Sequence, residues 1–166
     1  MHKYTLLALL CVVALFSGCK GKARPDGMPE LVNVVVVVTQ DGAPLADAAL
    51  NLISSDGSCK WSVGGKSDES GRATLYTQGD FKGAPEGTFK VGVIKMDYTV
   101  KEGATDDEGN PLQITEEQKK HPELMDVRMV TMKSAVPDEV TNPQNSPLEI
   151  TISKSAKEIP LEVPAN

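Results

Sequence analysis

The sequence predicts an all-β fold, a sandwich of short strands, and three observations lead to this prediction. Five consecutive valines, Val34 to Val38, are stiff at χ1 and favour a strand over a helix. Shorter segments such as 72–77 alternate apolar and polar residues, as half-buried strands do. Turn signals recur between these segments at the spacing that is typical of a β-sandwich.

The first strand is expected over residues 31–39. Because it lacks polar alternation, we expect both of its faces to be covered for most of its length. The turn at 40–44 contains Asp41-Gly42, a pair that supplies the positive φ of a tight hairpin. The next strand spans 45–53 and has two distinct faces. One face carries Ala48, Leu50 and Leu52, and the other carries Ala49, Asn51 and Ile53.

Further strands follow at short intervals along the chain. After a turn at 54–58, residues 59–63 are expected to form a short strand that ends at Gly64-Gly65. A turn at 68–71 leads into the strand at 72–77, and a loop over 79–87 precedes a strand at 88–95. Phe89, Val91 and Val93 share one face of that strand, with Lys90 and Lys95 on the solvent side.

The strand pattern is interrupted at about residues 97–133, which are charged and less regular. Within this insertion Thr115 and Gln118 match a capping box, so a short helix is expected to start at Glu116. Pro122 interrupts that helix or opens a second turn that ends near Arg128. Two strands, 148–153 and 158–163, then complete the fold, and Pro160 places the last of them at a sheet edge.

The first 18 residues have the three parts of a secretory signal peptide. His2 and Lys3 are basic, residues 5–16 are an apolar run too short for a bilayer span of about 20 residues, and Ser17-Gly18 precede Cys19. The stretch 15–19, Leu-Phe-Ser-Gly-Cys, resembles the lipobox of bacterial lipoproteins, in which the cysteine thiol is lipidated and the bond before it is cut. The alternatives are an ordinary signal peptide with a cysteine near its cut and an uncleaved anchor.

Cleavage before Cys19 would leave a chain of 148 residues that begins with a polar tether over 19–30. Only Lys3 is lost among the charged side chains, so 16 basic and 23 acidic residues remain, a net charge of −7. This balance excludes the concentrated basic face that nucleic-acid binding requires, and it disfavours electrostatic adhesion to anionic lipid. Cys11 leaves with the signal and Cys19 carries the lipid, so Cys59 has no partner for an internal disulfide.

Four stretches in this order resemble the carboxypeptidase-regulatory-like family, whose transthyretin-like (prealbumin-like) β-sandwiches occur in bacterial lipoproteins. They are Asp41-Gly-Ala-Pro-Leu-Ala-Asp-Ala48, Ser67-Asp-Glu-Ser-Gly-Arg-Ala-Thr-Leu75, Ala84-Pro-Glu-Gly-Thr-Phe-Lys-Val-Gly-Val93 and Val136-Pro-Asp-Glu-Val-Thr-Asn-Pro-Gln-Asn-Ser-Pro-Leu148. The resemblance implies a seven-stranded antiparallel Greek-key sandwich, transthyretin-like or Ig-like, over residues 31–166. The short helical insertion would then precede the last two strands. The resemblance also implies an accessory module that has no active site to transfer.

Few residues suggest chemistry. His121 is the only histidine of the mature chain, it lies in a charged helical segment, and no nucleophile-elbow motif accompanies it. Asp106, Asp107, Glu108 and Asn110 form an oxygen-rich cluster that could hold Ca²⁺, but the cluster lacks EF-hand spacing, and a solvated acidic turn is favoured.

Two further side chains have alternative interpretations. Trp61, the only tryptophan, would be a stacking platform for a sugar if exposed, and burial in the core is favoured. Cys59 is expected to be a buried free thiol rather than one half of an intermolecular disulfide.

The sequence therefore predicts a non-catalytic, lipid-anchored protein of the cell envelope, whose β-sandwich is a structural or protein-interaction module. Its partners would be the membrane, through lipid on Cys19, and another envelope protein, with no cofactor, metal or nucleic acid. A glycan- or calcium-binding accessory module is the alternative. The location would be extracytoplasmic. Because Lys20 rather than Asp follows the cysteine, the outer membrane is favoured if the cell has one.

Overall fold

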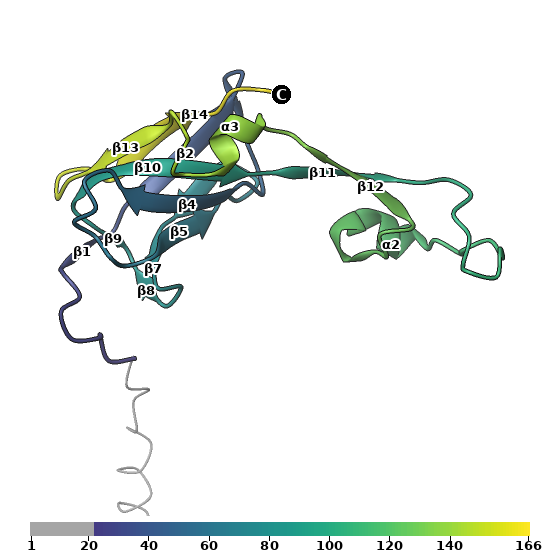
Figure 1. Ribbon diagram of the computed structural model, residues 1–166, viewed down its shortest axis with the longest axis horizontal. Coiled ribbons are helices and arrows are strands. Elements are labelled where there is room, and N and C mark those ends of the chain that lie inside the picture. The colour runs from purple at the N-terminus through teal and green to yellow at the C-terminus, as the bar shows by residue number, and fades with distance from the viewer. Residues whose placement is uncertain (1–21) are drawn as a thin grey trace, which may run out of the picture.

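The computed structural model describes residues 22–166, and its main feature is a β-rich body from which a long arm extends (Figure 1). We call residues 31–95 and 135–163 the body, residues 96–134 the arm and residues 22–30 the tether. Strands predominate and the helices are short, which confirms the predicted all-β class. The predicted signal peptide and Cys19 lie outside the described residues.

The larger sheet of the body has six strands, and every neighbouring pair in it is antiparallel. In spatial order they are β13 (Glu149–Ile152), β10 (Gly87–Ile94), β4 (Ala49–Ser54), β5 (Val63–Lys66), β7 (Tyr76–Thr77) and β8 (Phe81–Lys82). Phe89 of β10 lies opposite Ser54 on one side and Ile150 on the other, so β10 is central to the sheet.

The second sheet is built on β2 (Val35–Gln40). β2 pairs with β14 (Glu158–Glu162) on one side and with β6 (Arg72–Thr74) and β3 (Ala43–Pro44) on the other. β14 runs parallel to β2, so the prediction that every strand pair is antiparallel is wrong for this pair. Pro160 lies opposite Val37 in this edge strand, where its missing N–H interrupts no second ladder, as predicted.

The two sheets enclose one apolar core. β2, β4 and β10 supply its centre, and alternate residues of each strand point inward. The valine run shows the pattern: Val34, Val36 and Val38 are buried, whereas Val35 and Val37 are half-buried. The prediction that both faces are covered is therefore wrong for the outer face, which is only partly shielded.

The predicted inward faces of the next strands are confirmed. Ala48, Leu50 and Leu52 are buried on one side of β4, and Phe89, Val91 and Val93 are buried in β10. Burial of a side chain of this size stabilises the fold by roughly 1.5–3 kcal/mol relative to exposure. The hairpin between β2 and β3 is also confirmed, because Asp41 and Gly42 both have positive φ, 52° and 76°, as a type I′ turn requires.

The region after β4 differs from the prediction. Residues 59–62 are irregular, and the strand is β5, which runs through Gly64 and Gly65 instead of ending there. A Cβ on Gly64 would lie 2.7 Å from the carbonyl oxygen of Leu50, and one on Gly65 would lie 2.5 Å from that of Thr74. Glycine is therefore needed here for close strand packing and does not signal a chain reversal.

Two predicted segments are divided. The strand expected at 72–77 is split at the buried Leu75, so that β6 belongs to one sheet and β7 to the other. The loop expected at 79–87 contains β8 and β9 (Ala84–Pro85), and β9 pairs with β1 (Leu31–Val32) where the tether enters the body. The strand at 148–153 is confirmed as β13.

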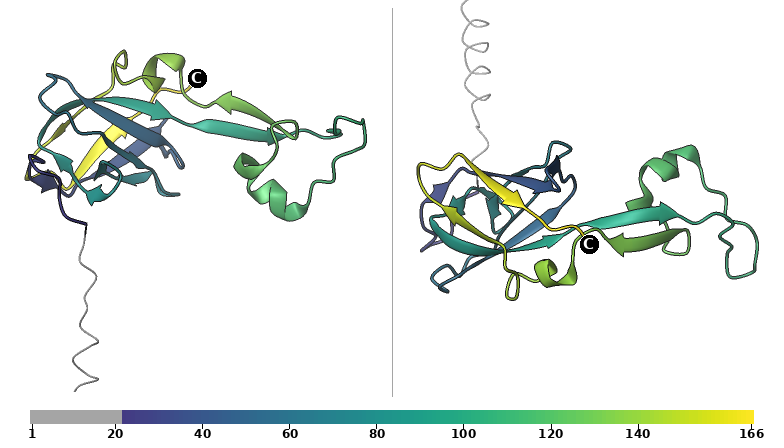
Figure 2. Two further views of the ribbon diagram at one scale, coloured as in Figure 1. Left: turned by 60° about the horizontal axis from the view of Figure 1, so that its bottom comes forward. Right: turned by 90° about the horizontal axis from the view of Figure 1, so that it is seen from above.

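The insertion predicted at about 97–133 is more regular than expected. β11 (Met96–Val100) and β12 (Val130–Ser134) pair along their whole length as a two-stranded ribbon, with Met96 opposite Ser134 and Val100 opposite Val130. The arm extends away from the body in two further views as well (Figure 2). Met96, Tyr98 and Val100 alternate with polar residues and are half-buried, so β11 has the periodicity of a strand, and the charged residues that follow it obscured this signal.

The helical part of the insertion is confirmed. α2 (Glu116–Lys120) starts where the capping box places it: Thr115 Oγ1 accepts from the backbone N–H of Gln118, and Gln118 Oε1 accepts from that of Thr115. Pro122 then opens a 3₁₀ helix, η2 (Pro122–Leu124). A third helix, α3 (Asp138–Thr141), was not predicted; it follows the arm and packs on β10 through the buried Val140.

Candidate functional site

The tether runs onto the surface of the body at the end where β1 and β9 pair. Lys22 forms an ion pair with Asp80 in the turn between β7 and β8. Glu30 pairs with Lys154 at 3.0 Å, and the backbone N–H of Lys154 donates to Glu86 at 2.9 Å. These contacts join the tether, the β9–β10 link and the loop after β13 at one end of the molecule.

The loop between β4 and β5 forms the second wall of this end. Asp56 organises its first turn, because its carboxylate accepts from the Ser54 hydroxyl and from the backbone N–H of Ser58. The hydrogen bond from Ser54, followed by those from Ser58, lowers the pKa of Asp56 to about 2. The loop therefore leaves β4 in a defined direction and brings Cys59, Lys60 and Trp61 opposite the tether.

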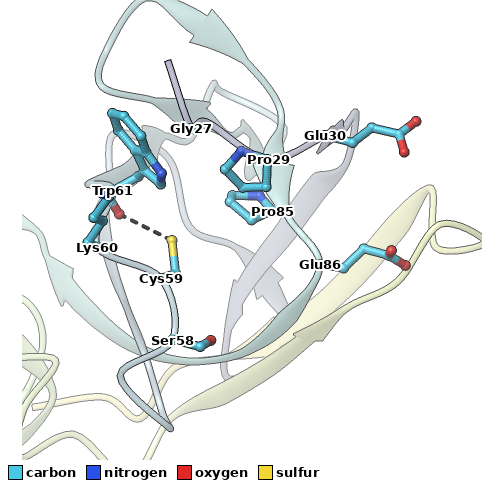
Figure 3. A pocket seen from close by; sticks show the side chains of 9 residues that line it. All are labelled: Gly27, Pro29, Glu30, Ser58, Cys59, Lys60, Trp61, Pro85 and Glu86. Atoms are coloured by element: carbon cyan, nitrogen blue, oxygen red, sulfur yellow. Dashed lines mark hydrogen bonds between the residues drawn. The ribbon is translucent and has the colours of Figure 1, made fainter. Parts of the chain in front are cut away.

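A hollow of about 570 Å³ lies between these segments (Figure 3). The tether, the β4–β5 loop and the β9–β10 link line it, through Gly27, Pro29, Glu30, Ser58, Cys59, Lys60, Trp61, Pro85 and Glu86. Pro29 and Pro85 lie next to each other opposite Trp61, and the carboxylates of Glu30 and Glu86 point away from the indole ring (Figure 3).

Trp61 is half-buried, so the favoured burial of its side chain in the core is wrong. The indole borders the hollow, and Lys60 Nζ lies 5.6 Å from the ring centroid. An ammonium at this distance interacts favourably with the negative face of the ring. The pair thus presents an aromatic surface beside a positive charge.

Cys59 is also half-buried, so the predicted full burial of this thiol is wrong. Its Sγ donates to the carbonyl oxygen of Trp61 at 3.6 Å and packs against the edge of the core. The lining of the hollow contains this one thiol and no histidine, because His121 lies on the arm. The hollow therefore offers apolar, aromatic and charged contacts for binding.

The other predicted site residues lie on the arm. His121 follows α2, is exposed, and has Nδ1 3.2 Å from Glu123 Oε1. Asp106 uses its carboxylate within its own turn, accepting from the backbone N–H groups of Glu108 at 3.0 Å and Asn110 at 2.8 Å. The bonds from Asn110 come first among the causes that lower the pKa of Asp106.

Arg128 ties this turn to the segment that leads into β12. It forms a two-point contact with Asp126 at 3.0 and 2.9 Å and reaches Asp107 at 3.0 Å. The oxygens of Asp106 and Asp107 that were considered for Ca²⁺ thus already face protein donors. Between residues 22 and 166, no three His, Cys, Asp or Glu side chains are grouped as a metal site.

The arm exposes apolar side chains that the sequence interpretation did not single out. Leu124 is 80% exposed, Val127 66% and Met132 49%, on a segment whose surroundings are acidic. Residues 101–128 hold eight acidic and four basic side chains. The sequence did carry a signal for these exposed side chains. A Leu and a Val lie in a charged segment that has neither strand nor helix periodicity, so the pattern predicts no buried face for them.

No helix within residues 22–166 has the length and apolar character needed to cross a bilayer. Comparison with known proteins gives no further assignment: no family model, no curated protein and no solved structure matches this chain.

Proposed function

We propose that this protein is a non-catalytic lipoprotein of the cell envelope, held at a membrane by acyl chains on Cys19, and that its arm contacts another envelope protein. The observation that carries the proposal is the projecting ribbon, with exposed Leu124 and Val127 on the segment between α2 and β12. An arm that lies outside the core of the body and leaves Leu124 and Val127 exposed adds little to that core, so a role in contact with a partner accounts for it better than a role in stability.

The proposal of a lipid anchor is supported by the lipobox-like sequence at residues 15–19 and by the polar tether that follows it. Two or three acyl chains on one thiol hold a protein stably, at about 0.8 kcal/mol per buried CH₂, whereas a single chain gives marginal binding. The polar tether then links the lipid to the body. Such a protein would lie outside the cytoplasm, and Lys20 after the cysteine favours the outer membrane where the cell has one.

We further propose that the body is a Greek-key sandwich of the carboxypeptidase-regulatory-like, transthyretin-like type. Support comes from its principal strands, β2, β4, β5, β10, β13, β14 and the divided strand β6–β7, which together make seven in two sheets. In this proposal β11 and β12 are an insertion between two strands of the sandwich. The protein would then use a display fold and carry its contact surface on the inserted arm.

The anchor is tested by the mass of the mature N-terminus. We expect a chain that begins at Cys19 and carries acyl groups, and we expect Cys19→Ser to remain unprocessed. An unmodified sulfur on a cleaved chain would overturn the lipoprotein assignment.

The contact surface is tested by site-specific photo-cross-linking in intact cells. A photoreactive phenylalanine analogue replaces Val127 on the arm, and in a matched control it replaces Tyr76, which is 38% exposed on the body. We expect a discrete cross-linked envelope protein from position 127 and none from position 76. Cross-linking from the body position alone would contradict the proposal.

Glycan binding at the hollow is the second candidate, because half-buried Trp61 borders a space with polar groups on its rim. Carbohydrates stack on aromatic rings of this kind. A ligand at 100 times its Kd would stabilise the fold by about 2.7 kcal/mol, so a thermal-shift screen with envelope glycan fragments detects it. The absence of any shift would remove this candidate. Calcium is not proposed, since Asp106 and Asp107 already face protein donors.

A further inference from the structure

We propose that the Trp61–Lys60 pair contacts the phospholipid headgroup layer and so fixes the orientation of the body on the membrane. The inference rests on the lipid anchor at Cys19 proposed above and adds to it a second contact. A lipid on a flexible tether would hold the protein near a membrane without orienting it, whereas a second contact beside the tether would define which surface faces the lipid.

Chain length limits how far this end of the body can lie from the lipid. Lys22, which is ion-paired to Asp80, is three residues after Cys19, and three residues span at most about 11 Å. An exposed ion pair is weak by itself, but β1 pairs with β9 and Glu30 pairs with Lys154, so the end of the tether that enters the body is also held there. The end that carries the hollow is therefore the end nearest the anchored thiol.

Trp61 lies beside the tether at that end. Its ring and Gly27 and Pro29 of the tether border the same hollow (Figure 3). Tryptophan is enriched at membrane–water interfaces because its apolar ring and polar N–H suit the headgroup region. A half-exposed indole at the end of a protein that faces lipid has the exposure and the chemistry for this contact.

Positive charge accompanies the ring. Lys60 Nζ lies 5.6 Å from the indole centroid, and Arg24 and Lys82 are exposed on the tether and β8, whereas Lys22 is already paired with Asp80. Ammonium and guanidinium groups are attracted to phosphate in the headgroup layer. Because the mature chain carries a net charge of −7, these few groups would not bring it to an anionic membrane unaided, so the contact is expected only when the lipid is attached.

This orientation would place the arm alongside the membrane. The tether leaves the lower end of the body in Figure 1, whereas β11 and β12 leave its side, so the two point in different directions. With the tethered end on the lipid, the arm would extend laterally above the surface. Its reach would then favour a partner anchored in the same membrane.

The test uses the fluorescence of Trp61, the only tryptophan of the chain. The lipidated mature protein is placed in phosphatidylglycerol-containing vesicles whose acyl chains are brominated close to the headgroup, brominated close to the chain end, or unmodified. We expect a shift of the emission to shorter wavelength and a loss of intensity that is greater with bromine near the headgroup. In the matched control, W61F/V127W, the tryptophan is on the arm, and neither change is expected.

A second pair of variants tests the charge. Lys60→Glu is expected to reduce the quenching of Trp61, whereas Lys101→Glu on the arm is expected to leave it unchanged. If Cys19 carries acyl groups and Trp61 is nevertheless quenched no more than the W61F/V127W control, this inference is overturned while the lipoprotein assignment stands. Protection of Trp61 by a soluble glycan instead of lipid would also overturn it. If Cys19 carried no acyl groups, both this inference and the lipoprotein assignment would be overturned.

Discussion

The body and the arm are both made of paired strands, but they differ in what lies between and around those strands. The body encloses a cluster of 20 buried apolar residues contributed by both sheets and α3. Within residues 96–134 only Val130 is buried. The body therefore owes its stability mainly to the hydrophobic effect, whereas the arm has only the half-buried face of β11 and depends more on a backbone ladder, a helix cap and surface ion pairs. Elements with little buried apolar surface, such as the arm, open locally at a lower free energy than core elements do.

This difference predicts that truncation of a core residue and truncation of an arm residue have unequal effects. Phe89→Ala removes the largest fully buried side chain, and we expect the free energy of unfolding to fall by about 3–5 kcal/mol. Chemical denaturation monitored by circular dichroism measures this. Met132→Ala on the arm is the matched control, with an expected change within about 0.5 kcal/mol. Equal losses in the two variants would show that the arm contributes to the same cooperative unit.

The helix of the arm offers a smaller, local effect. Thr115→Ala removes the hydroxyl that accepts from the Gln118 N–H, and we expect a loss of about 1 kcal/mol in the local stability of α2. Amide exchange at Gln118 and Lys119 should accelerate while the global unfolding free energy stays the same. Thr99→Ala in β11 serves as control, because Thr99 caps no helix. A drop in global stability with Thr115→Ala would contradict the separation of arm and body.

Acid should loosen the arm at the contact between Arg128 and Asp126. Two-point hydrogen bonding by Arg128 lowers the pKa of Asp126 to about 2, below the ordinary value of 3.8. A depressed carboxylate pKa contributes stability that is fully present above the unfolded pKa and is lost as the pH falls through the folded value. We therefore expect exchange at residues 126–128 and at the Asp106 turn to increase between about pH 4 and pH 2. Exchange that did not change over this interval would show that the Arg128 contacts do not order the arm.

Salt gives the smallest expected effect. The ion pairs Glu116–Lys119 and Glu117–Lys120 are exposed, and exposed pairs are screened when the Debye length falls to about 3 Å at 1 M salt. We expect a slight loss of protection in α2 and none in β4 or β10, measured by amide exchange at low and high salt. Comparable sensitivity in the body would argue against burial as its main source of stability.

The same difference explains which parts of the fold could be predicted from the sequence. Where burial determines structure, periodicity reports it: the inward faces of β4 and β10 follow directly from alternating Leu, Val and Phe. Asp41-Gly42 and the Thr115–Gln118 box are local signals, and both were interpreted correctly. Gly64 and Gly65 misled the prediction because a close approach between strands needs the same residue as a turn. The parallel β14–β2 pair depends on chain topology, which a pattern within one strand does not encode.

The candidate site was less predictable for a related reason. Trp61 was placed in the core because large aromatic residues are usually buried, but its ring borders a hollow between the tether and the β4–β5 loop, and this arrangement joins segments far apart in the sequence. The ribbon was missed although Met96, Tyr98 and Val100 alternate with polar residues, because the charged residues between the two strands dominated the interpretation of the whole insertion. The period of a short strand is easily obscured when the chain that follows it is charged and irregular.

Amide hydrogen exchange across residues 22–166 under increasing denaturant tests the central claim, the separation of body and arm, most directly. We predict that amides of β2, β4 and β10 exchange only through global unfolding, with a free energy that falls steeply with denaturant. Amides of β11 and β12 should exchange through an opening of lower free energy that depends little on denaturant. If the ribbon and the body gave the same free energy at every denaturant concentration, the arm would be part of the folded unit, and its assignment as a separate contact surface would be contradicted.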